Sequence, residues 1–160
     1  MPTILCIDDN QSGLAMRKLM LETLGYSVFI AEGGPSGLAL LRTQDVDAII
    51  LDSRMQGMPG EVVADTIRKE RPKTPIIVLT GFPDIPPGLV ALADAIVTKG
   101  QPLQVLLAAL ERLTGTKPEK PAVKTSRAVQ EARRLREQAK AIRSGRQKLL
   151  FGRQRRLGTT

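Results

Sequence analysis

Five polar side chains end or directly follow short aliphatic runs, and their types could handle a phosphoryl group. They are Asp8 and Asp9 after residues 3–7, Asp52 after 48–51, Thr80 after 76–79, and Lys99 after 95–98. Three carboxylates held together repel one another at neutral pH, and a hard divalent cation such as Mg²⁺ relieves that repulsion. One carboxylate could then attack phosphorus, while the cation, the hydroxyl and the ammonium share the charge on the phosphoryl oxygens.

Alternating apolar and amphipathic stretches predict a sheet that would bring these side chains together. Apolar runs predict strands at residues 3–7, 26–31, 48–51, 76–79 and 95–98, and amphipathic stretches predict helices at 12–24, 35–42, 60–69 and 103–113. Pro86, Pro87 and Gly88 allow only a short helix, from about Leu89, before the last strand. The strands are almost entirely apolar, as expected of a parallel sheet covered by helices on both faces. Because parallel strands end at one edge, we expect the polar residues to converge there.

The composition narrows the classes of protein to which the chain can belong. Its 160 residues include no His, which excludes Ser-His and Cys-His dyads and the commonest zinc ligand. The single Cys6 excludes an intrachain disulfide and fits a reducing, cytoplasmic location. No apolar stretch approaches about 18 residues, so neither a transmembrane segment nor a signal peptide is expected.

Charge divides the chain into a mildly acidic body and a strongly basic tail. Residues 1–115 hold 10 basic and 13 acidic residues, whereas residues 116–160 hold 14 basic and 3 acidic ones. We therefore predict a domain at 1–115, a Pro/Lys-rich linker at 116–125, and a basic tail at 126–160 that is partly helical between about 126 and 144. Three interpretations of the tail stay open: a solvated segment, a segment that docks on a partner, or non-specific contact with nucleic acid or an anionic membrane surface.

Four motifs resemble those of the receiver domain of two-component response regulators: IDDN at residues 7–10, LDSRMQGMPG at 51–60, LTG at 79–81, and the lysine at 99. The resemblance covers roughly residues 3–114. It implies a flavodoxin-like α/β fold, with a five-stranded parallel sheet in the order 2-1-3-4-5 and helices on both faces, as in the chemotaxis member of the family. It also implies that Asp52 is the phosphoacceptor, Thr80 the switch hydroxyl and Lys99 the lysine that senses the phosphoryl group.

The same resemblance implies a metal site and a set of partners. Asp9 and Asp52 would ligate Mg²⁺ directly, Asp8 would act mainly through water, and the backbone carbonyl of Arg54 would complete the protein ligands. The phosphoryl donor would be a histidine kinase or a histidine phosphotransfer protein in a phosphorelay, because a chain without His cannot donate it. The domain would be a signalling module that assists its own phosphorylation, not a metabolic enzyme, and an unidentified output protein would receive the signal.

Several positions depart from the usual receiver pattern. Gln56 stands where the family usually has Pro, and Pro59 where it has an acid or an amide. Ile96 replaces the usual aromatic residue, and Pro102 follows Lys99 only after two intervening residues. These departures leave one alternative: a pseudo-receiver scaffold or adaptor whose tail binds nucleic acid or an anionic membrane surface. A flavin site at the same edge is disfavoured because three carboxylates would repel a cofactor phosphate.

Overall fold

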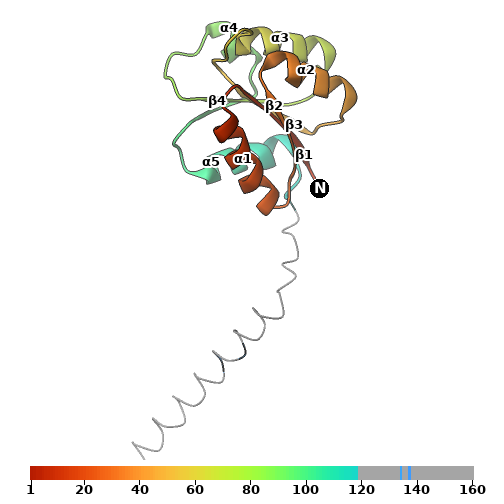
Figure 1. The fold of residues 1–160 in the computed structure, drawn as a ribbon, viewed down its shortest axis with the longest axis vertical. Coiled ribbons are helices and arrows are strands. Elements are labelled where there is room, and N and C mark those ends of the chain that lie inside the picture. Colours follow the sequence, from red (N-terminus) through yellow and green to blue (C-terminus); the bar gives the residue numbers. More distant parts are fainter. Residues whose placement is uncertain (119–133, 135–136, 138–160) are drawn as a thin grey trace, which may run out of the picture. The chain divides into compact units, whose positions relative to one another are not determined.

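Five strands alternate with five helices in the computed structural model, which describes residues 1–118, 134 and 137 (Figure 1). The strands are β1 (Thr3–Asp8), β2 (Ser27–Glu32), β3 (Ala48–Asp52), β4 (Ile76–Thr80) and β5 (Ala95–Thr98). The helices are α1 (Gln11–Thr23), α2 (Gly34–Thr43), α3 (Gly60–Glu70), α4 (Pro87–Leu92) and α5 (Leu103–Thr114). This succession confirms the α/β class that the alternating pattern predicts.

The strands form one parallel sheet in the order β2-β1-β3-β4-β5, which confirms the order that the resemblance implies. Its register aligns the strand ends that carry the candidate site. Leu51 pairs with Ile7, which places Asp52 level with Asp8 on the neighbouring strand. On the other side of β3, Asp52 pairs with Leu79, so that Thr80 follows one step further along.

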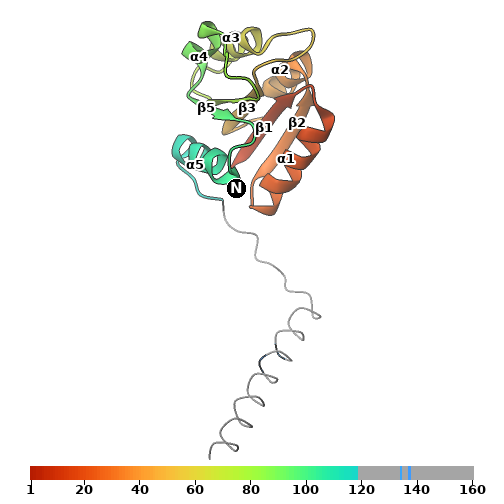
Figure 2. The same cartoon turned by 90° about the vertical axis from the view of Figure 1, so that its left-hand side faces the viewer.

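Helices cover both faces of the sheet, with α1 and α5 on one side and α2, α3 and α4 on the other (Figures 1 and 2). Successive residues of β1 alternate between the two apolar cores: Ile4 and Cys6 pack toward α1 and α5, and Leu5 and Ile7 toward the other three helices. Side chains alternate across a strand in this way, and burial on both faces explains why the strands carry almost no polar residue before their ends.

At the carboxyl edge of the sheet, three of the predicted strands end one residue before the observed ones. Strands β1, β3 and β4 include Asp8, Asp52 and Thr80, which the apolar pattern excluded. Backbone pairing continues through each polar residue, since ladder hydrogen bonds do not depend on whether a side chain is apolar. Helix α4 is short, as predicted, and begins two residues before Leu89, because a proline is well tolerated in the first turn of a helix.

Gly60 fixes the start of α3 against the end of β3. A methyl carbon at this position would lie 2.6 Å from the carbonyl oxygen of Asp52 and 2.9 Å from that of Ser53. Backbone atoms cannot move aside as a flexible side chain can, so any larger residue here would displace the strand end that carries Asp52.

We expect Gly60→Ala to lower the free energy of unfolding by about 1–3 kcal/mol through this overpacking. The matched control is Gly13→Ala in α1, where the added carbon would only contact Asn10 at 3.4 Å or more. That change should raise stability by about 0.5–1 kcal/mol, because alanine favours the helix. Urea unfolding followed by far-UV circular dichroism measures both, and equal shifts in the same direction would contradict the prediction.

The predicted linker beyond residue 118 and the predicted tail at 126–160 lie outside the described residues, apart from 134 and 137. Their proposed helix and its contacts therefore stay predictions. Within the described part of the chain, no helix is both long and apolar enough to cross a membrane.

Candidate functional site

The three predicted carboxylates meet at the carboxyl edge of the sheet. Asp8, Asp9 and Asp52 each offer one oxygen, and these oxygens lie within 4.8 Å of one another. Asp8 and Asp52 are buried, at 1% and 6% exposure, whereas Asp9 is exposed. Buried carboxylates this close require positive charge nearby or must take up protons.

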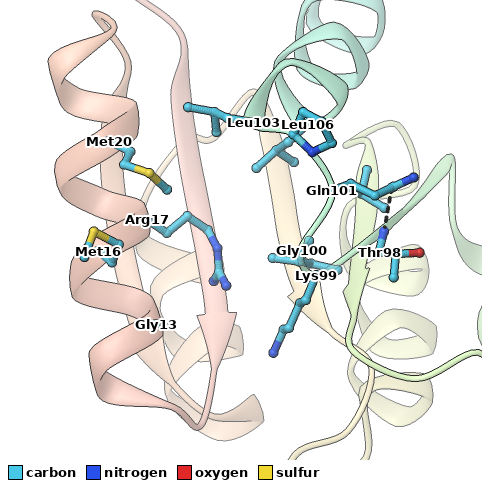
Figure 3. Close-up of a pocket in the computed structure, with 13 residues that line it drawn as sticks. Gly13, Met16, Arg17, Met20, Thr98, Lys99, Gly100, Gln101, Leu103 and Leu106 are labelled. Carbon is cyan, nitrogen blue, oxygen red and sulfur yellow. Dashed lines mark hydrogen bonds between the residues drawn. The ribbon is translucent and has the colours of Figure 1, made fainter.

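Lys99 supplies part of that positive charge. Its Nζ lies 2.7 Å from Asp52 Oδ1 and 3.2 Å from Asp8 Oδ2. The strand-end register positions the residue, because the Lys99 amide donates to the Thr80 carbonyl at 2.6 Å. The chain then turns at Gly100, whose φ of +94° is one that glycine adopts readily. In this turn Gln101 Oε1 accepts a hydrogen bond from the Thr98 amide at 3.0 Å (Figure 3).

Both members of the Asp52–Lys99 pair have raised pKa values, for different reasons. Burial raises the pKa of the Asp52 carboxyl and the charge of Asp8 adds to it, although Lys99 and the Arg54 amide act in the opposite direction. Burial lowers the pKa of the Lys99 ammonium, but its hydrogen bonds to Asp52 and Asp8 and their charges outweigh that effect, and the pKa rises. Lys99 brings one positive charge to a cluster of three carboxylates, so a further cation would relieve their remaining repulsion.

Backbone amides of the neighbouring loops hold the three carboxylates in place. The Asn10 amide donates to Asp8 Oδ1 at 3.0 Å, and the Gln56 amide donates to Asp9 Oδ2 at 2.9 Å. The Arg54 amide donates to Asp52 Oδ2 at 3.2 Å, which places this peptide group beside the predicted phosphoacceptor. The role of the Arg54 carbonyl as a metal ligand stays a prediction.

Thr80 lies at the same edge, but its hydroxyl makes its hydrogen bonds away from the carboxylates. It accepts from Ser53 Oγ at 2.8 Å, donates to the Phe82 carbonyl at 3.1 Å and accepts from the Phe82 amide. The predicted role of Thr80 as the switch hydroxyl would require Oγ1 to leave these partners, and it stays a prediction. The guanidinium of Arg54 lies over the ring of the same Phe82, 4.1 Å from its centroid.

The chemistry of the donor set fits Mg²⁺. Carboxylate oxygens are hard ligands, and Mg²⁺ commonly takes one or two of them while keeping several waters and binding a phosphoryl oxygen. Asp9, the exposed member of the cluster, is open to a hydrated ion. The individual ligand roles of Asp8, Asp9 and Asp52 stay predictions.

The sequence patterns missed a second cation of the site, the buried Arg17. Its Nη2 lies 3.3 Å from Asp8 Oδ2, and the residue is only 8% exposed. Its position in the sequence could have revealed it. Helical spacing places Arg17 on the same face of α1 as Leu14 and Leu21, which both pack in the core. An arginine on that face needs a carboxylate partner, and Asp8 is the nearest acid of the predicted site.

Comparison with known proteins decides the family. The family model of the response regulator receiver domain matches residues 4–111, which is more than half of the chain. The chain belongs to the response regulator receiver family. This receiver domain is 37% identical over 93 residues to the transcriptional regulatory protein GlrR of Escherichia coli (strain K12), covering 58% of this chain and 21% of GlrR. It is also 31% identical over 84 residues to the sensor protein GacS of Pseudomonas syringae pv. syringae, covering 49% of this chain and 9% of GacS.

Solved receiver structures have the same fold. The response regulator TrrA of Thermotoga maritima, in complex with Mg²⁺-BeF, matches with a TM-score of 0.65 and 31% identity, over 71% of this chain and 99% of that one. The chemotaxis protein CheY4 of Vibrio cholerae matches with a TM-score of 0.65 and 29% identity, over 71% of this chain and 98% of that one. The predicted receiver fold is thereby confirmed. By contrast, the chain spans only a small part of GlrR and GacS, so their activities as whole proteins do not transfer to it.

Proposed function

We propose that this receiver domain accepts a phosphoryl group on Asp52 from a histidine kinase or a histidine phosphotransfer protein, and signals through protein interaction. The observation that carries the proposal is the convergence of Asp52 with two further carboxylates and the Lys99 ammonium at one sheet edge. Similarity to both a transcriptional regulatory protein and a sensor protein supports a role in a phosphorelay.

In the proposed transfer, a carboxylate oxygen of Asp52 attacks phosphorus, an aspartyl P–O bond forms, and the P–N bond to the donor imidazole breaks. The leaving imidazole keeps the bonding electron pair and takes up a proton. Lys99 Nζ lies within 2.7 Å of Asp52 and is placed to bind an oxygen of the arriving phosphoryl group. A bound Mg²⁺ would supply further positive charge for the phosphoryl oxygens.

The protein's own contribution is positioning and charge. The amides of Asn10, Arg54 and Gln56 orient the three carboxylates, and burial of Asp52 limits its contact with water. The domain would thus assist its own phosphorylation without turning over a metabolic substrate. No contact among the described residues favours the alternative of nucleic-acid or membrane binding through residues 116–160.

A small acyl phosphate tests this function without requiring the partner kinase. We expect the full chain, incubated with the acyl phosphate and MgCl₂, to gain the mass of one phosphoryl group, and to gain none when EDTA replaces MgCl₂. Intact mass spectrometry at several times provides the measurement. A chain that stays unmodified at saturating donor and Mg²⁺ would refute the phosphoacceptor function and leave the pseudo-receiver alternative.

A further inference from the structure

Arg17 lies where helix α1 faces the turn between β5 and α5. Its side chain and that of Lys99 line a cavity of about 350 Å³ between these elements, and both reach toward the sheet edge (Figure 3). The residue is buried on a helical face otherwise occupied by leucines. Burying a guanidinium is costly unless a carboxylate compensates it, so this side chain calls for a physical reason beyond filling space.

The compensating carboxylate is Asp8, which Arg17 shares with Lys99. Arg17 Nη2 lies 3.3 Å, and Lys99 Nζ 3.2 Å, from the same Asp8 Oδ2. The other oxygen, Oδ1, accepts from the Asn10 amide. Cys6 also neighbours Arg17, but burial raises the pKa of its thiol to about 12, so Cys6 is neutral and contributes no countercharge.

This contact changes the charge balance of the acidic cluster. Asp8, Asp9 and Asp52 contribute three carboxylates, and the Lys99 ammonium offers one countercharge to them. Arg17 offers a second, and unlike the partly exposed Lys99 it is held in place within the core. A fixed positive charge beside a carboxylate of a cation site reduces the attraction of that site for a divalent ion.

We propose that Arg17 is a built-in countercharge that stabilises the metal-free acidic cluster and thereby weakens the affinity of the site for Mg²⁺. The inference rests on the proposed metal-assisted function and deepens it, because it makes Arg17 a determinant of the Mg²⁺ concentration that the domain requires. The countercharge role predicts two effects of opposite sign. Loss of Arg17 should lower the stability of the metal-free protein and should raise its affinity for Mg²⁺.

The test titrates MgCl₂ into the full chain and into Arg17→Met, and follows the backbone amide signals of Asn10 and Gln56 by ¹⁵N–¹H NMR. These amides donate to Asp8 and Asp9 and report on the site directly. We expect Arg17→Met to bind Mg²⁺ about tenfold more tightly, as for the loss of one nearby like charge at a partly screened site. Its melting temperature should be lower than that of the wild type in EDTA and should rise more on addition of Mg²⁺.

Two variants control for charge and for location. Arg17→Lys keeps the charge and should have an affinity closer to the wild-type value than Arg17→Met has. Lys18→Met removes one positive charge from the neighbouring position of α1, where Lys18 pairs with Glu22 on the surface, and should leave Mg²⁺ affinity unchanged. A role of Arg17 in packing alone would lower stability without tightening Mg²⁺ binding.

Each outcome decides a different claim. If the wild type binds no Mg²⁺, the proposed metal-assisted function fails. If the wild type binds Mg²⁺ but Arg17→Met binds it equally or less tightly, only the role of Arg17 fails. Should Arg17→Met fold only in the presence of Mg²⁺, the countercharge role is supported. Should both Arg17→Met and the polar Arg17→Gln stay unfolded at saturating Mg²⁺, Arg17 serves the fold and the inference is overturned.

Discussion

Replacement of Asp52 by asparagine is expected to abolish the phosphoryl adduct while leaving the fold intact. An amide oxygen is a poor nucleophile, so modification by the acyl phosphate should fall more than about 1,000-fold, to background. Asp8 cannot replace Asp52, because it is 1% exposed and its oxygens are engaged by Arg17, Lys99 and the Asn10 amide. Intact mass at matched times measures the effect.

We do not expect Asp52→Asn to destabilise the fold. The direction of the Asp52 pKa shift gives the sign of the change in stability. The folded state raises the pKa of Asp52 above its ordinary value, so the ionised carboxyl costs stability. The protonated carboxyl therefore favours the folded state at low pH, and this contribution to stability is lost as the pH rises through the raised pKa. Asparagine cannot ionise, so metal-free Asp52→Asn should melt at or above the wild-type temperature at neutral pH, and its melting temperature should depend less on pH in the acidic range.

The matched control is Asp45→Asn. Asp45 is an aspartate with a fully exposed side chain, and within the described part of the chain it pairs with Arg71 at 3.4 Å. Its replacement should leave the adduct unchanged, since Asp45 precedes β3 and lies at the opposite edge of the sheet from the site. An adduct of wild-type size in Asp52→Asn would assign the phosphoryl group to another residue and contradict the account.

Lys99→Met is expected to slow adduct formation by about 100-fold. The change keeps the length of the side chain but removes the ammonium that lies 2.7 Å from Asp52 and would bind the phosphoryl oxygens. Loss of one charged donor at a reacting oxyanion typically costs this much. Initial rates of acyl-phosphate modification, followed by intact mass at saturating MgCl₂, provide the measurement.

A separate readout distinguishes this role from a loss of metal. Lys99 competes with a cation for Asp8 and Asp52, so Mg²⁺ binding in Lys99→Met should be retained or tightened even as the rate falls. The control is Lys69→Met, whose exposed ammonium pairs with Asp65 along α3, and which should react at the wild-type rate. Unchanged kinetics in Lys99→Met would remove Lys99 from the transfer step.

The sequence was sufficient for the sheet and for most of the site because both depend on one regularity. Apolar runs fix the five strands, and parallel strands end at one edge, so Asp8, Asp52 and Lys99 could be expected to meet. The strand order came from the resemblance, since nothing in the apolar pattern distinguishes neighbouring strands from distant ones. Convergence of the carboxylates is thus a consequence of topology, not of local sequence.

What the sequence could not supply depends on side-chain direction. The core pattern counts apolar residues only, so the buried Arg17 on the face of Leu14 and Leu21 went unnoticed. The present partners of the Thr80 hydroxyl, Ser53 and Phe82, could not be read from the sequence either, because rotamers at a strand end follow their local partners; its role as the switch hydroxyl stays a prediction.

The residue that carries the phosphoryl group can be identified directly. The wild-type chain, treated with acyl phosphate and MgCl₂, would be reduced with borohydride, which converts an aspartyl phosphate to homoserine, and then digested and sequenced by tandem mass spectrometry. If Asp52 is the phosphoacceptor, we expect homoserine at position 52 and unmodified aspartate at positions 8 and 9. Homoserine at position 8 or 9 instead, or none anywhere in a chain fully exposed to donor and Mg²⁺, would contradict this assignment.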